Sequence, residues 1–533
     1  MTTFEIQPST FRHWKLSVDE DIATLELEVD SEAPAFGDYE LKLNSYDIDV
    51  DIELANAIRH IRLAHVDVKC VVITSALEGM FCAGANIRML AAADHSHKVN
   101  FCKFTNETRL ELEEASELSG IRFLAAVNGS CSGGGYELAL ACDHIVLVDD
   151  KSTSVSLPEV PLLGVLPGTG GLTRLTDKRH VRRDRADIFA TKAEGISGQE
   201  ALDWGLVDEL APPTEFDEAI AKRAVSLSST SSRLPGLPTV ISPLEISLAE
   251  DAIGYEWVNL KLSGAYADLT ISVADTPIWL LQTARELDDV ICRLRFDFPE
   301  IGTLVLRTEG SIEDAVSLDR ALQRSNENIQ LETRLLWKRC LARLDLTSKT
   351  LVAAVEPGSC FAGVLFELAL AADRTFMLDG QFQDVKVSPP PAVVRLTDTN
   401  FGQLPMWNGL SRLTSRLWGN EEALAKLSDV RDQNLFASEA LDFGVVTTTP
   451  DDLDWDDELR LFIEERSSFS ADALTAMEAN QRFSGPETMA TKIFARLSAW
   501  QNWVFTRPNA SGPEGSLQRY GTGSRPKFDN RRT

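Results

Sequence analysis

The chain lacks both long apolar segments and an excess of positive charge. No uninterrupted apolar run approaches the ~20 residues that a helix needs to cross a membrane, and the first 15 residues contain no apolar stretch typical of a signal peptide. Its 81 Asp and Glu outnumber its 52 Lys and Arg, so the formal net charge is −29. A large negative charge disfavours nucleic acids and anionic membranes as partners. We therefore expect the protein to bind neither.

Patterns typical of disulfide frameworks and metal sites are scarce as well. The eight cysteines are scattered and form no CxxC pair, which is typical of reduced thiols in the cytosol. Of only seven histidines, His95 and His97 form the single close pair, and this is too little to predict a zinc site. We expect a cytoplasmic protein without a metal site.

The composition and the alternation of elements predict an α/β fold. At 533 residues, 44% hydrophobic and 25% charged, the chain is long enough for two or three soluble domains. Residues 23–30 alternate as a half-buried strand, and 51–64 repeat apolar groups at helical spacing. Strands and helices then alternate to about residue 210. The polar, Pro-rich stretch 228–243 predicts an interdomain linker.

A triple glycine runs directly into a glutamate at Gly133-Gly134-Gly135-Tyr136-Glu137. The preceding apolar run 123–127 predicts a buried strand, and 137–142 favours a helix. Glycines at such a turn let the backbone approach a ligand closely, because no Cβ intervenes. The first amides of a helix have no intrahelical acceptor and lie at the positive end of its dipole. A developing anion would be stabilised there.

Two further segments add a second turn and a second carboxylate. Phe81-Cys-Ala-Gly84-Ala85-Asn86-Ile87 follows a predicted strand at 68–74 and again places a glycine before a helix start. The Ala85 amide is therefore a candidate second donor. Glu159 lies between two prolines, on a loop that cannot be a regular helix. Two amides for an oxyanion and two carboxylates for proton transfer predict an acid–base site.

In this order and spacing, the three segments resemble the crotonase (enoyl-CoA hydratase/isomerase) superfamily. The resemblance implies a ββα spiral fold. It implies that the backbone amides of Ala85 and Gly134 hold the thioester oxygen of an acyl-CoA substrate. It also makes Glu137 and Glu159 the catalytic acid/base pair.

The flanking segments resemble a ring-cleaving branch of this superfamily over nearly the whole chain; among them are FRHWKLS, LKLNSYDIDVDIEL, KVNFCKFTNETR and RYGTGSRPKFD. This resemblance implies conversion of 2,3-epoxy-2,3-dihydrobenzoyl-CoA and water to 3,4-didehydroadipyl-CoA semialdehyde and formate, in aerobic benzoate degradation. It implies a homodimer and no metal, oxygen or redox cofactor, since coenzyme A is part of the substrate. An ordinary enoyl-CoA hydratase and a non-catalytic acyl-CoA-binding scaffold are the alternatives.

Each candidate residue also has a simpler interpretation. By position, Lys42 and Arg88 match the family's basic residues near coenzyme A, and Cys102 is a candidate to face the ring of the substrate. Exposed charges and a small core residue explain these three equally simply. Glu137 would then only cap a helix, and Glu159 would be an ordinary loop carboxylate.

Two other chemistries match short motifs only in part. Gly129-Ser-Cys131-Ser-Gly133 mimics a nucleophile elbow, with His144 near in sequence, but a hydrolase also needs a base and an orienting acid, for which no motif occurs. Gly168-Thr-Gly-Gly171 does not continue as GxGxxG, which disfavours a fused dinucleotide-binding dehydrogenase.

The second half of the chain repeats the first. VEPGSCFAGVLFELALAADR at 355–374 resembles VNGSCSGGGYELALACDH at 127–144, and SEALDFGVV at 438–446 resembles QEALDWGLV at 199–207. Internal repetition on this scale predicts a duplicated domain. The fold class we expect is therefore α/β, with tandem crotonase-like domains followed by a helical C-terminal region.

The second copy is degenerate. Ala362-Gly363-Val364 stands in place of the triple glycine, Gln381-Phe-Gln-Asp384 stands where we expect the Pro-Glu pair, and Glu367 survives without its companions. We expect this domain to shape, cover or dimerise and not to catalyse. The predicted limits are 1–245 for the catalytic domain, 246–457 for the degenerate domain, and 458–533 for the helical region and tail.

Overall fold

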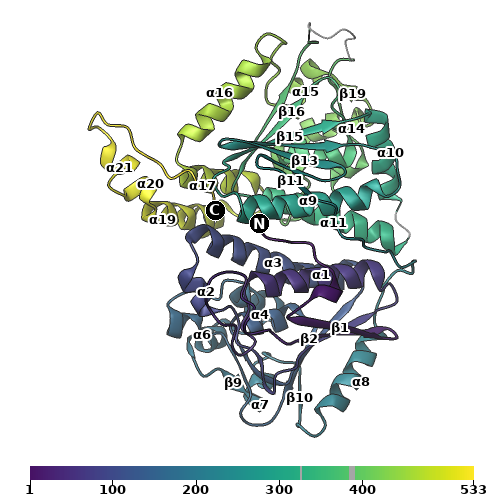
Figure 1. Ribbon diagram of the computed structural model, residues 1–533, viewed down its shortest axis with the longest axis vertical. Coiled ribbons are helices and arrows are strands. Elements are labelled where there is room, and N and C mark those ends of the chain that lie inside the picture. Colours follow the sequence, from purple (N-terminus) through teal and green to yellow (C-terminus); the bar gives the residue numbers. More distant parts are fainter. Residues whose placement is uncertain (325–326, 383–389) are drawn as a thin grey trace. The chain divides into compact units, whose positions relative to one another are not determined.

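The chain divides into two units near the predicted linker. The computed structural model describes residues 1–324, 327–382 and 390–533. One unit, here the first module, comprises Thr3–Pro243 and Asn326–Glu332; the other, the second module, comprises Met1–Thr2, Leu244–Ser325 and Thr333–Thr533. Each contains its own large sheet (Figure 1). The domain limits drawn from the sequence stay predictions.

The first module is built on a six-stranded sheet. Its strands are, in spatial order, β1 (Trp14–Asp19), β2 (Ile22–Leu27), β3 (Cys70–Ser75), β5 (Arg122–Val127), β7 (His144–Val148) and β10 (Glu209–Ala211). All neighbours are parallel except β1 and β2. The strands β3, β5 and β7 are apolar runs buried almost throughout, as expected of parallel strands covered on both faces.

A second, four-stranded sheet positions the candidate site. It consists of β4 (Gly79–Cys82), β6 (Gly129–Ser132), β8 (Ser154–Ser156) and β9 (Ile196–Ser197). Strands β4, β6 and β8 run parallel, so their carboxyl ends lie at one edge. The Gly84 turn, the triple glycine and the Glu159 loop each follow one of these strands. Three segments far apart in sequence are thereby brought to the same edge.

Helices complete the first module: α1 (Ile48–Ala64), α2 (Ile87–Ala92), α3 (His95–Leu118), α4 (Gly134–Ala141), α5 (Gly171–Thr173), α6 (Arg183–Thr191), α7 (Gly198–Asp203) and α8 (Phe216–Ser228). Between them lie the single turns η1 (Pro8–Thr10), η2 (Glu159–Leu163) and η3 (Arg174–Lys178). The two long helices α1 and α3 lie side by side (Figure 1). A buried ion pair between Asp51 and Arg109, 2.5 Å apart, joins them.

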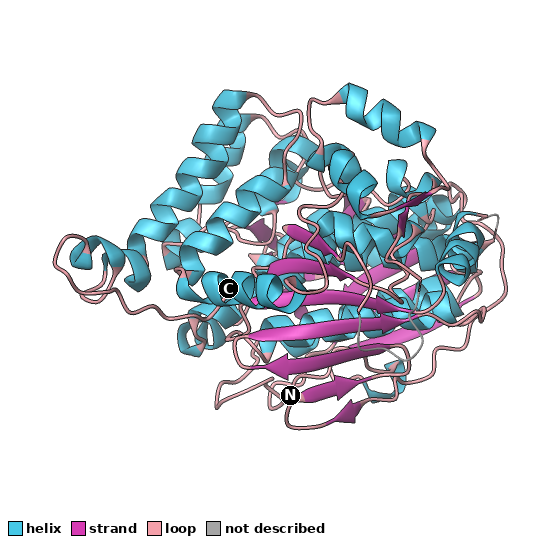
Figure 2. Ribbon diagram, turned by 90° about the horizontal axis from the view of Figure 1, so that it is seen from above, coloured by secondary structure: helices cyan, strands magenta, loops and turns pink. Residues whose placement is uncertain are grey.

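The second module has a seven-stranded sheet in sequence order: β11 (Ser247–Leu248), β12 (Ala252–Gly254), β13 (Val258–Ser263), β14 (Tyr266–Ser272), β15 (Thr303–Glu309), β16 (Thr350–Val355) and β17 (Arg374–Met377). The last four strands are parallel. Figure 2 shows helices packed against strands, the layering that an α/β fold requires.

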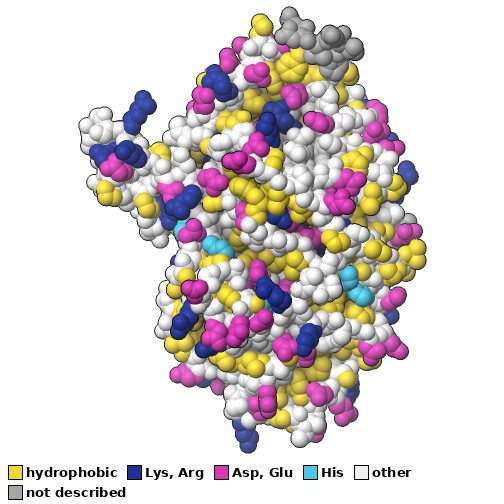
Figure 3. Space-filling view, viewed as in Figure 1, with side chains coloured by type: hydrophobic (Ala, Val, Ile, Leu, Met, Phe, Trp, Pro, Cys, Tyr) yellow, Lys and Arg dark blue, Asp and Glu magenta, His cyan; other side chains and the backbone are white. Residues whose placement is uncertain are grey.

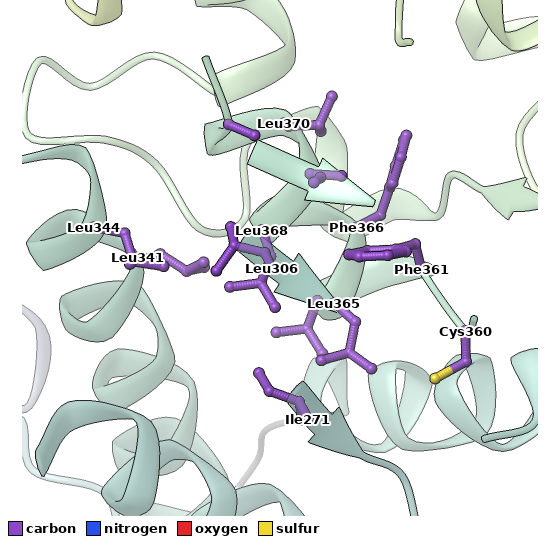
Figure 4. Close-up of a cluster of buried hydrophobic side chains, with 14 of the residues drawn as sticks. Ile271, Leu306, Leu341, Leu344, Cys360, Phe361, Leu365, Phe366, Leu368 and Leu370 are labelled. Atoms are coloured by element: carbon purple, nitrogen blue, oxygen red, sulfur yellow. The ribbon is translucent and has the colours of Figure 1, made fainter. Parts of the chain in front are cut away.

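The remaining elements of the second half are α9 (Trp279–Phe296), α10 (Ile312–Gln323), α11 (Asn328–Asp345), η4 (Gly363–Leu365), α12 (Phe366–Ala371), β18 (Val394–Arg395), η5 (Asp398–Phe401), α13 (Arg412–Arg416), α14 (Glu421–Asp429), β19 (Asn434–Leu435) and α15 (Ala437–Asp442). Apolar side chains from sheet and helices meet in one buried cluster (Figure 4), including Ile271, Leu306, Leu341, Leu344, Phe366 and Leu368.

The chain ends in helices: α16 (Trp455–Ser468), α17 (Ala471–Arg482), α18 (Met489–Thr491), η6 (Lys492–Leu497), α19 (Ser498–Thr506), α20 (Pro508–Ser511) and α21 (Ser516–Arg519). Trp500 and Trp503 meet edge to face, with ring centroids 5.4 Å apart. Among the described residues, no helix is long and apolar enough to span a membrane. Asp and Glu side chains are spread over the face shown in Figure 3.

Candidate active site

The two glycine turns lie against one another. Both Gly84 and Gly133 have positive φ, +86° and +55°, a conformation that residues with a Cβ rarely adopt. A Cβ placed on Gly84 would lie 2.7 Å from the amide nitrogen of Gly134. The turn that carries Ala85 is therefore in direct contact with the start of α4. The Ala85 and Gly134 amides thus belong to two turns in contact, and their role as paired donors stays a prediction.

Each residue of the triple glycine is required by a different neighbour. A Cβ on Gly133 would lie 2.8 Å from Glu159 Oε1, one on Gly134 would lie 2.0 Å from the hydroxyl oxygen of Tyr46, and one on Gly135 would lie 2.5 Å from the Cys82 carbonyl oxygen. Real Cβ atoms do not approach other atoms this closely. All three glycines are therefore needed because other residues approach this turn closely on three sides.

Glu137 is buried and held in place by a loop 30 residues downstream. Its side chain, in the first turn of α4, belongs to a residue only 2% exposed. The amides of Thr169 and Gly171 donate to Oε1 at 3.0 and 2.7 Å, and the Thr169 hydroxyl donates to Oε2. The interpretation of Glu137 as a helix cap is wrong, because these bonds run to the loop and the N-cap position is Gly133.

Glu159 lies on the other side of the same turn, as the first residue of η2. Its Oε2 is buried and has no hydrogen-bond partner within the described part of the chain. Burial raises the pKa of Glu159 from 4.5 to about 7; its own backbone N–H opposes this rise and the charge of Glu137 adds to it. A carboxyl group with this pKa exchanges protons readily near neutral pH. The catalytic role of Glu159 stays a prediction.

The three other predicted residues lie in different surroundings. Cys102, on α3, is half-buried, and its Sγ would lie 3.7 Å from a Cβ on Gly168, in the loop that holds Glu137. Burial raises its pKa to about 11, with a further contribution from the charge of Glu137. Lys42 is exposed and pairs with Glu40 at 2.9 Å, and Arg88 is exposed on α2. The roles of all three stay predictions.

Sequence patterns did not identify the residues that fix this geometry. Thr169 belongs to Gly168-Thr-Gly-Gly171, which as a sequence motif resembles only an incomplete dinucleotide-binding loop. Arg174 steadies this loop by donating to the Thr169 carbonyl oxygen at 2.9 Å while it pairs with Glu113 at 2.8 Å. A clustering of glycines around one threonine was the only local signal.

The cysteine of the apparent nucleophile elbow is unsuited to that role. Cys131 is 0% exposed, and burial raises the pKa of its thiol well above the ordinary value. Because the thiolate is the nucleophile, both effects disfavour covalent catalysis.

In the second module, the backbone amide of the corresponding turn already has a hydrogen-bond acceptor within the protein. Gly363 has φ of +51°, nearly that of Gly133, and Val364 aligns with Gly134. The Val364 amide donates to Asp319 Oδ1 at 2.9 Å, and that carboxylate also accepts from Gln323 and Thr397 at 2.7 Å each. The amide that would hold an acyl oxygen therefore already binds a carboxylate.

The surviving glutamate of the second module is neutralised. Glu367 is buried and lies 3.0 Å from Arg412 and 2.8 Å from the Asn400 side-chain nitrogen. Burial raises its pKa, while Arg412 opposes this rise. Arg412 pairs at the same time with Asp345 at 2.7 Å. These contacts give Glu367 a structural role, and the expectation that this module does not catalyse stays a prediction.

The position of the degenerate Pro-Glu pair needs correction. We placed it at Gln381-Phe-Gln-Asp384, of which residues 383 and 384 lie outside the described residues. In the first module Ser132 pairs with Ser156, two residues before Pro158. The equivalent bridge joins Ala362 to Arg395, so the counterpart is Thr397-Asp398. Sequence comparison missed it because the proline is replaced by threonine and the carboxylate by the shorter aspartate.

Comparisons with known proteins place the chain among enzymes that act on acyl-CoA. The family described as enoyl-CoA hydratase/isomerase matches residues 40–234. The fatty acid oxidation complex subunit alpha of Shewanella loihica is 32% identical over 254 residues, which cover 47% of this chain and 33% of that protein. A solved structure of an enoyl-CoA hydratase from Geobacillus kaustophilus HTA426 is 34% identical, with a TM-score of 0.36, and covers 41% of this chain and 75% of its own.

One relative spans almost the entire chain. Benzoyl-CoA-dihydrodiol lyase of Aromatoleum evansii is 49% identical over 547 residues, which cover 99% of this chain and 97% of that protein. The match includes both modules and the C-terminal helices. The chain therefore belongs to the family of benzoyl-CoA-dihydrodiol lyase, within the crotonase (enoyl-CoA hydratase/isomerase) superfamily.

Proposed function

We propose that the first module cleaves the ring of 2,3-epoxy-2,3-dihydrobenzoyl-CoA with water, giving 3,4-didehydroadipyl-CoA semialdehyde and formate. The observation that carries this proposal is the convergence of the two glycine turns with Glu137 and Glu159 around Gly133 and Gly134. The resemblance of the whole chain to a benzoyl-CoA-dihydrodiol lyase supplies the substrate class.

The two backbone amides stabilise charge on the thioester oxygen. With the carbonyl between the Ala85 and Gly134 amides, electron density that moves out of the ring during hydration and C–C cleavage collects on that oxygen. Preorganised donors of this kind are worth about 3 kcal/mol each in other enzymes. The contact between the turns holds both amides in place before the substrate binds.

The two carboxylates have different environments and, we propose, different tasks. Glu137 accepts three hydrogen bonds and is fixed, so it orients water. Glu159 has a free buried oxygen and a pKa of about 7, so it exchanges protons with water and with the opening ring.

The reaction requires two molecules of water and no external oxidant. The seven-carbon acyl group takes up both waters, one C–C bond breaks, and one carbon leaves as formate. The epoxide already provides the oxidation level of the two products. We therefore propose that no metal or redox cofactor takes part, and we expect full activity after dialysis against a chelator.

Turnover of the epoxide tests the proposal directly. The full chain is incubated with 2,3-epoxy-2,3-dihydrobenzoyl-CoA and, separately, with crotonyl-CoA, and formate and acyl-CoA products are measured by mass spectrometry. We expect formate from the first and little hydration of the second. Hydration of crotonyl-CoA without formate release would instead identify an ordinary enoyl-CoA hydratase.

Substitution of Glu137 distinguishes an enzyme from a non-catalytic acyl-CoA-binding scaffold. We expect Glu137→Gln to lower kcat by at least about 10²-fold, the usual scale of acid–base contributions. Activity that is unchanged in this variant would reject the site.

Arg88→Ala should raise KM and leave kcat nearly unchanged if Arg88 contacts coenzyme A.

We further propose a cytoplasmic homodimer. The helices α18, η6 and α19 carry exposed apolar side chains, including Met489, Phe494 and Phe505, which are 73%, 76% and 54% exposed. Exposed apolar clusters of this kind mark interfaces between proteins. Light scattering of the purified chain measures the mass in solution, and a monomer at micromolar concentration would reject the dimer.

A further inference from the structure

Tyr46 connects the two glycine turns through both its backbone and its side chain. It pairs with Ala85 in a parallel bridge. Its amide donates to the Gly84 carbonyl oxygen at 3.0 Å, and its own carbonyl oxygen accepts from the Asn86 amide at 2.8 Å. The backbone of Tyr46 therefore fixes the turn that presents the Ala85 amide.

The side chain of the same residue reaches the other turn. A Cβ on Gly134 would lie 2.0 Å from the Tyr46 hydroxyl oxygen and 2.8 Å from the ring carbon that bears it. The hydroxyl group therefore occupies the space where any larger residue at position 134 would place its side chain. One residue thus contacts both proposed donors of the oxyanion site.

The backbone that leads into Tyr46 is itself held firmly. Leu43 and Asn44 both have positive φ, +59° and +52°, which for residues other than glycine persists only where the surroundings enforce it. The Asn44 side chain donates to the Leu27 carbonyl oxygen and to the Ser75 hydroxyl at 3.2 and 2.9 Å. The backbone immediately before Tyr46 is therefore rigid.

The ring is held as firmly as the backbone. Phe101 packs against it, with centroids 5.9 Å apart, and the Arg109 guanidinium lies 5.3 Å above its centroid. Arg109 is in turn fixed by Asp51 at 2.5 Å. Tyr46 is only 3% exposed, so its ring has little freedom to move away from Gly134.

The hydroxyl group of Tyr46 is enclosed by the protein. Its oxygen is buried from solvent and has no hydrogen-bond partner among the residues that the structure describes. Leaving a buried hydroxyl without a partner costs stability, so phenylalanine would be the better residue for packing alone. The ring carbon that bears the oxygen also lies 2.8 Å from a Cβ on Gly134, so the ring of a phenylalanine would still fill most of the space beside this turn.

We propose that Tyr46 is a positioning residue that sets the spacing between the Ala85 and Gly134 amides. This inference rests on the proposed function, because it assigns the two amides to the thioester oxygen. The donors of an oxyanion site act only within tenths of an ångström of the right place, and displacement by about 1 Å costs rate by about 10²-fold. A rigid aromatic side chain between two glycine turns supplies that precision.

Substitution of Tyr46 distinguishes an effect on the spacing of the two amides from a general loss of core packing. In Tyr46→Leu the ring is lost and the Gly134 turn is free to shift, so we expect kcat to fall by about 10²-fold and KM to change by less than about threefold. Tyr46→Phe retains the ring and should lose less than about fivefold in kcat. Phe123→Leu, a change at a buried aromatic residue at the amino end of β5, controls for loss of core packing and should leave kcat unchanged.

An infrared measurement on a bound ligand tests the spacing of the Ala85 and Gly134 amides without turnover. Benzoyl-CoA labelled with ¹³C at the thioester carbonyl should show a lowered C=O stretching frequency on the native protein and on Tyr46→Phe. On Tyr46→Leu the ligand should bind with the frequency returned toward its value in water. Purely structural damage lowers the amount bound and does not move the frequency of what is bound.

The outcomes distinguish the two proposals. If benzoyl-CoA binds the native protein with no change in its carbonyl frequency, the assignment of the oxyanion site fails. If the native shift is present and Tyr46→Leu keeps it together with native kcat, only the role of Tyr46 is overturned. If Tyr46→Phe loses as much kcat as Tyr46→Leu, the hydroxyl acts as a donor and the spacing role is wrong.

Discussion

Replacing Glu159 by glutamine should stabilise the protein, and more so at alkaline pH. Burial raises the pKa of this carboxyl group from 4.5 to about 7, which means that the fold disfavours its ionised form. Stability is therefore highest below the unfolded pKa of 4.5, falls as pH rises to about 7, and levels off above it. Glutamine cannot ionise, so the variant does not lose folding stability in this way as the pH rises.

The size of the effect follows from the pKa. A rise from 4.5 to about 7 corresponds to about 3 kcal/mol at 1.36 kcal/mol for each tenfold change. Glu159 is only half-buried, so screening by solvent reduces this to about 1–2 kcal/mol. For a module of this size, 1–2 kcal/mol is about 2–8 °C in Tm. The same substitution should lower kcat by about 10²-fold or more.

The assay compares native protein and Glu159→Gln by thermal unfolding at pH 5 and pH 8, with turnover measured in parallel. The difference in Tm between variant and native protein should grow from pH 5 to pH 8. A change at an exposed carboxylate, Glu78→Gln, supplies the baseline. A difference that is equal at the two pH values would show that Glu159 is not held in a desolvated position.

Three other predictions concern the second module, the loop that holds Glu137 and the absence of a metal from the proposed chemistry. Glu367→Gln should leave turnover within about twofold of native and lower stability by about 1–3 kcal/mol, because Arg412 loses one of its two carboxylate partners; loss of turnover equal to that of Glu137→Gln would place a second active site in the chain. Thr169→Val removes one donor to Glu137 while both amide donors remain, and should lower kcat about tenfold, the equivalent of one hydrogen bond to a charged group; native kcat would show that the hydroxyl is dispensable. Chelator-treated protein should keep its full rate of formate release, and a rate restored only by added metal would contradict the proposed chemistry.

The sequence was sufficient wherever the signal was local. Glycine next to a strand end, followed by a helical run, marks a turn that presents amides, and this holds for Gly84 and Gly134. Prolines on both sides of Glu159 exclude a regular helix there, and the structure has a single π-helical turn. Repetition of the segment around Glu367 is likewise local and indicates a second module of similar fold.

The sequence was insufficient where contacts join distant segments. The loop of Thr169 meets Glu137 across 32 residues, and Tyr46 meets Gly134 across 88; no periodicity encodes such meetings. The pKa of Glu159 depends on burial, which appears only after the chain has folded. The counterpart of the Pro-Glu pair was misplaced because strand register, and not residue type, identifies it.

The carboxylate of Asp319 on the Val364 amide has a consequence for how such proteins evolve. After a gene doubles, one copy is free to lose its chemistry, yet its old anion-binding turn still needs a negative group to satisfy it. A single acidic side chain on a neighbouring helix meets that need permanently. The second module keeps the backbone shape of the glycine turn, with the Asp319 carboxylate at the position where the proposed mechanism places a transient negative charge in the first module.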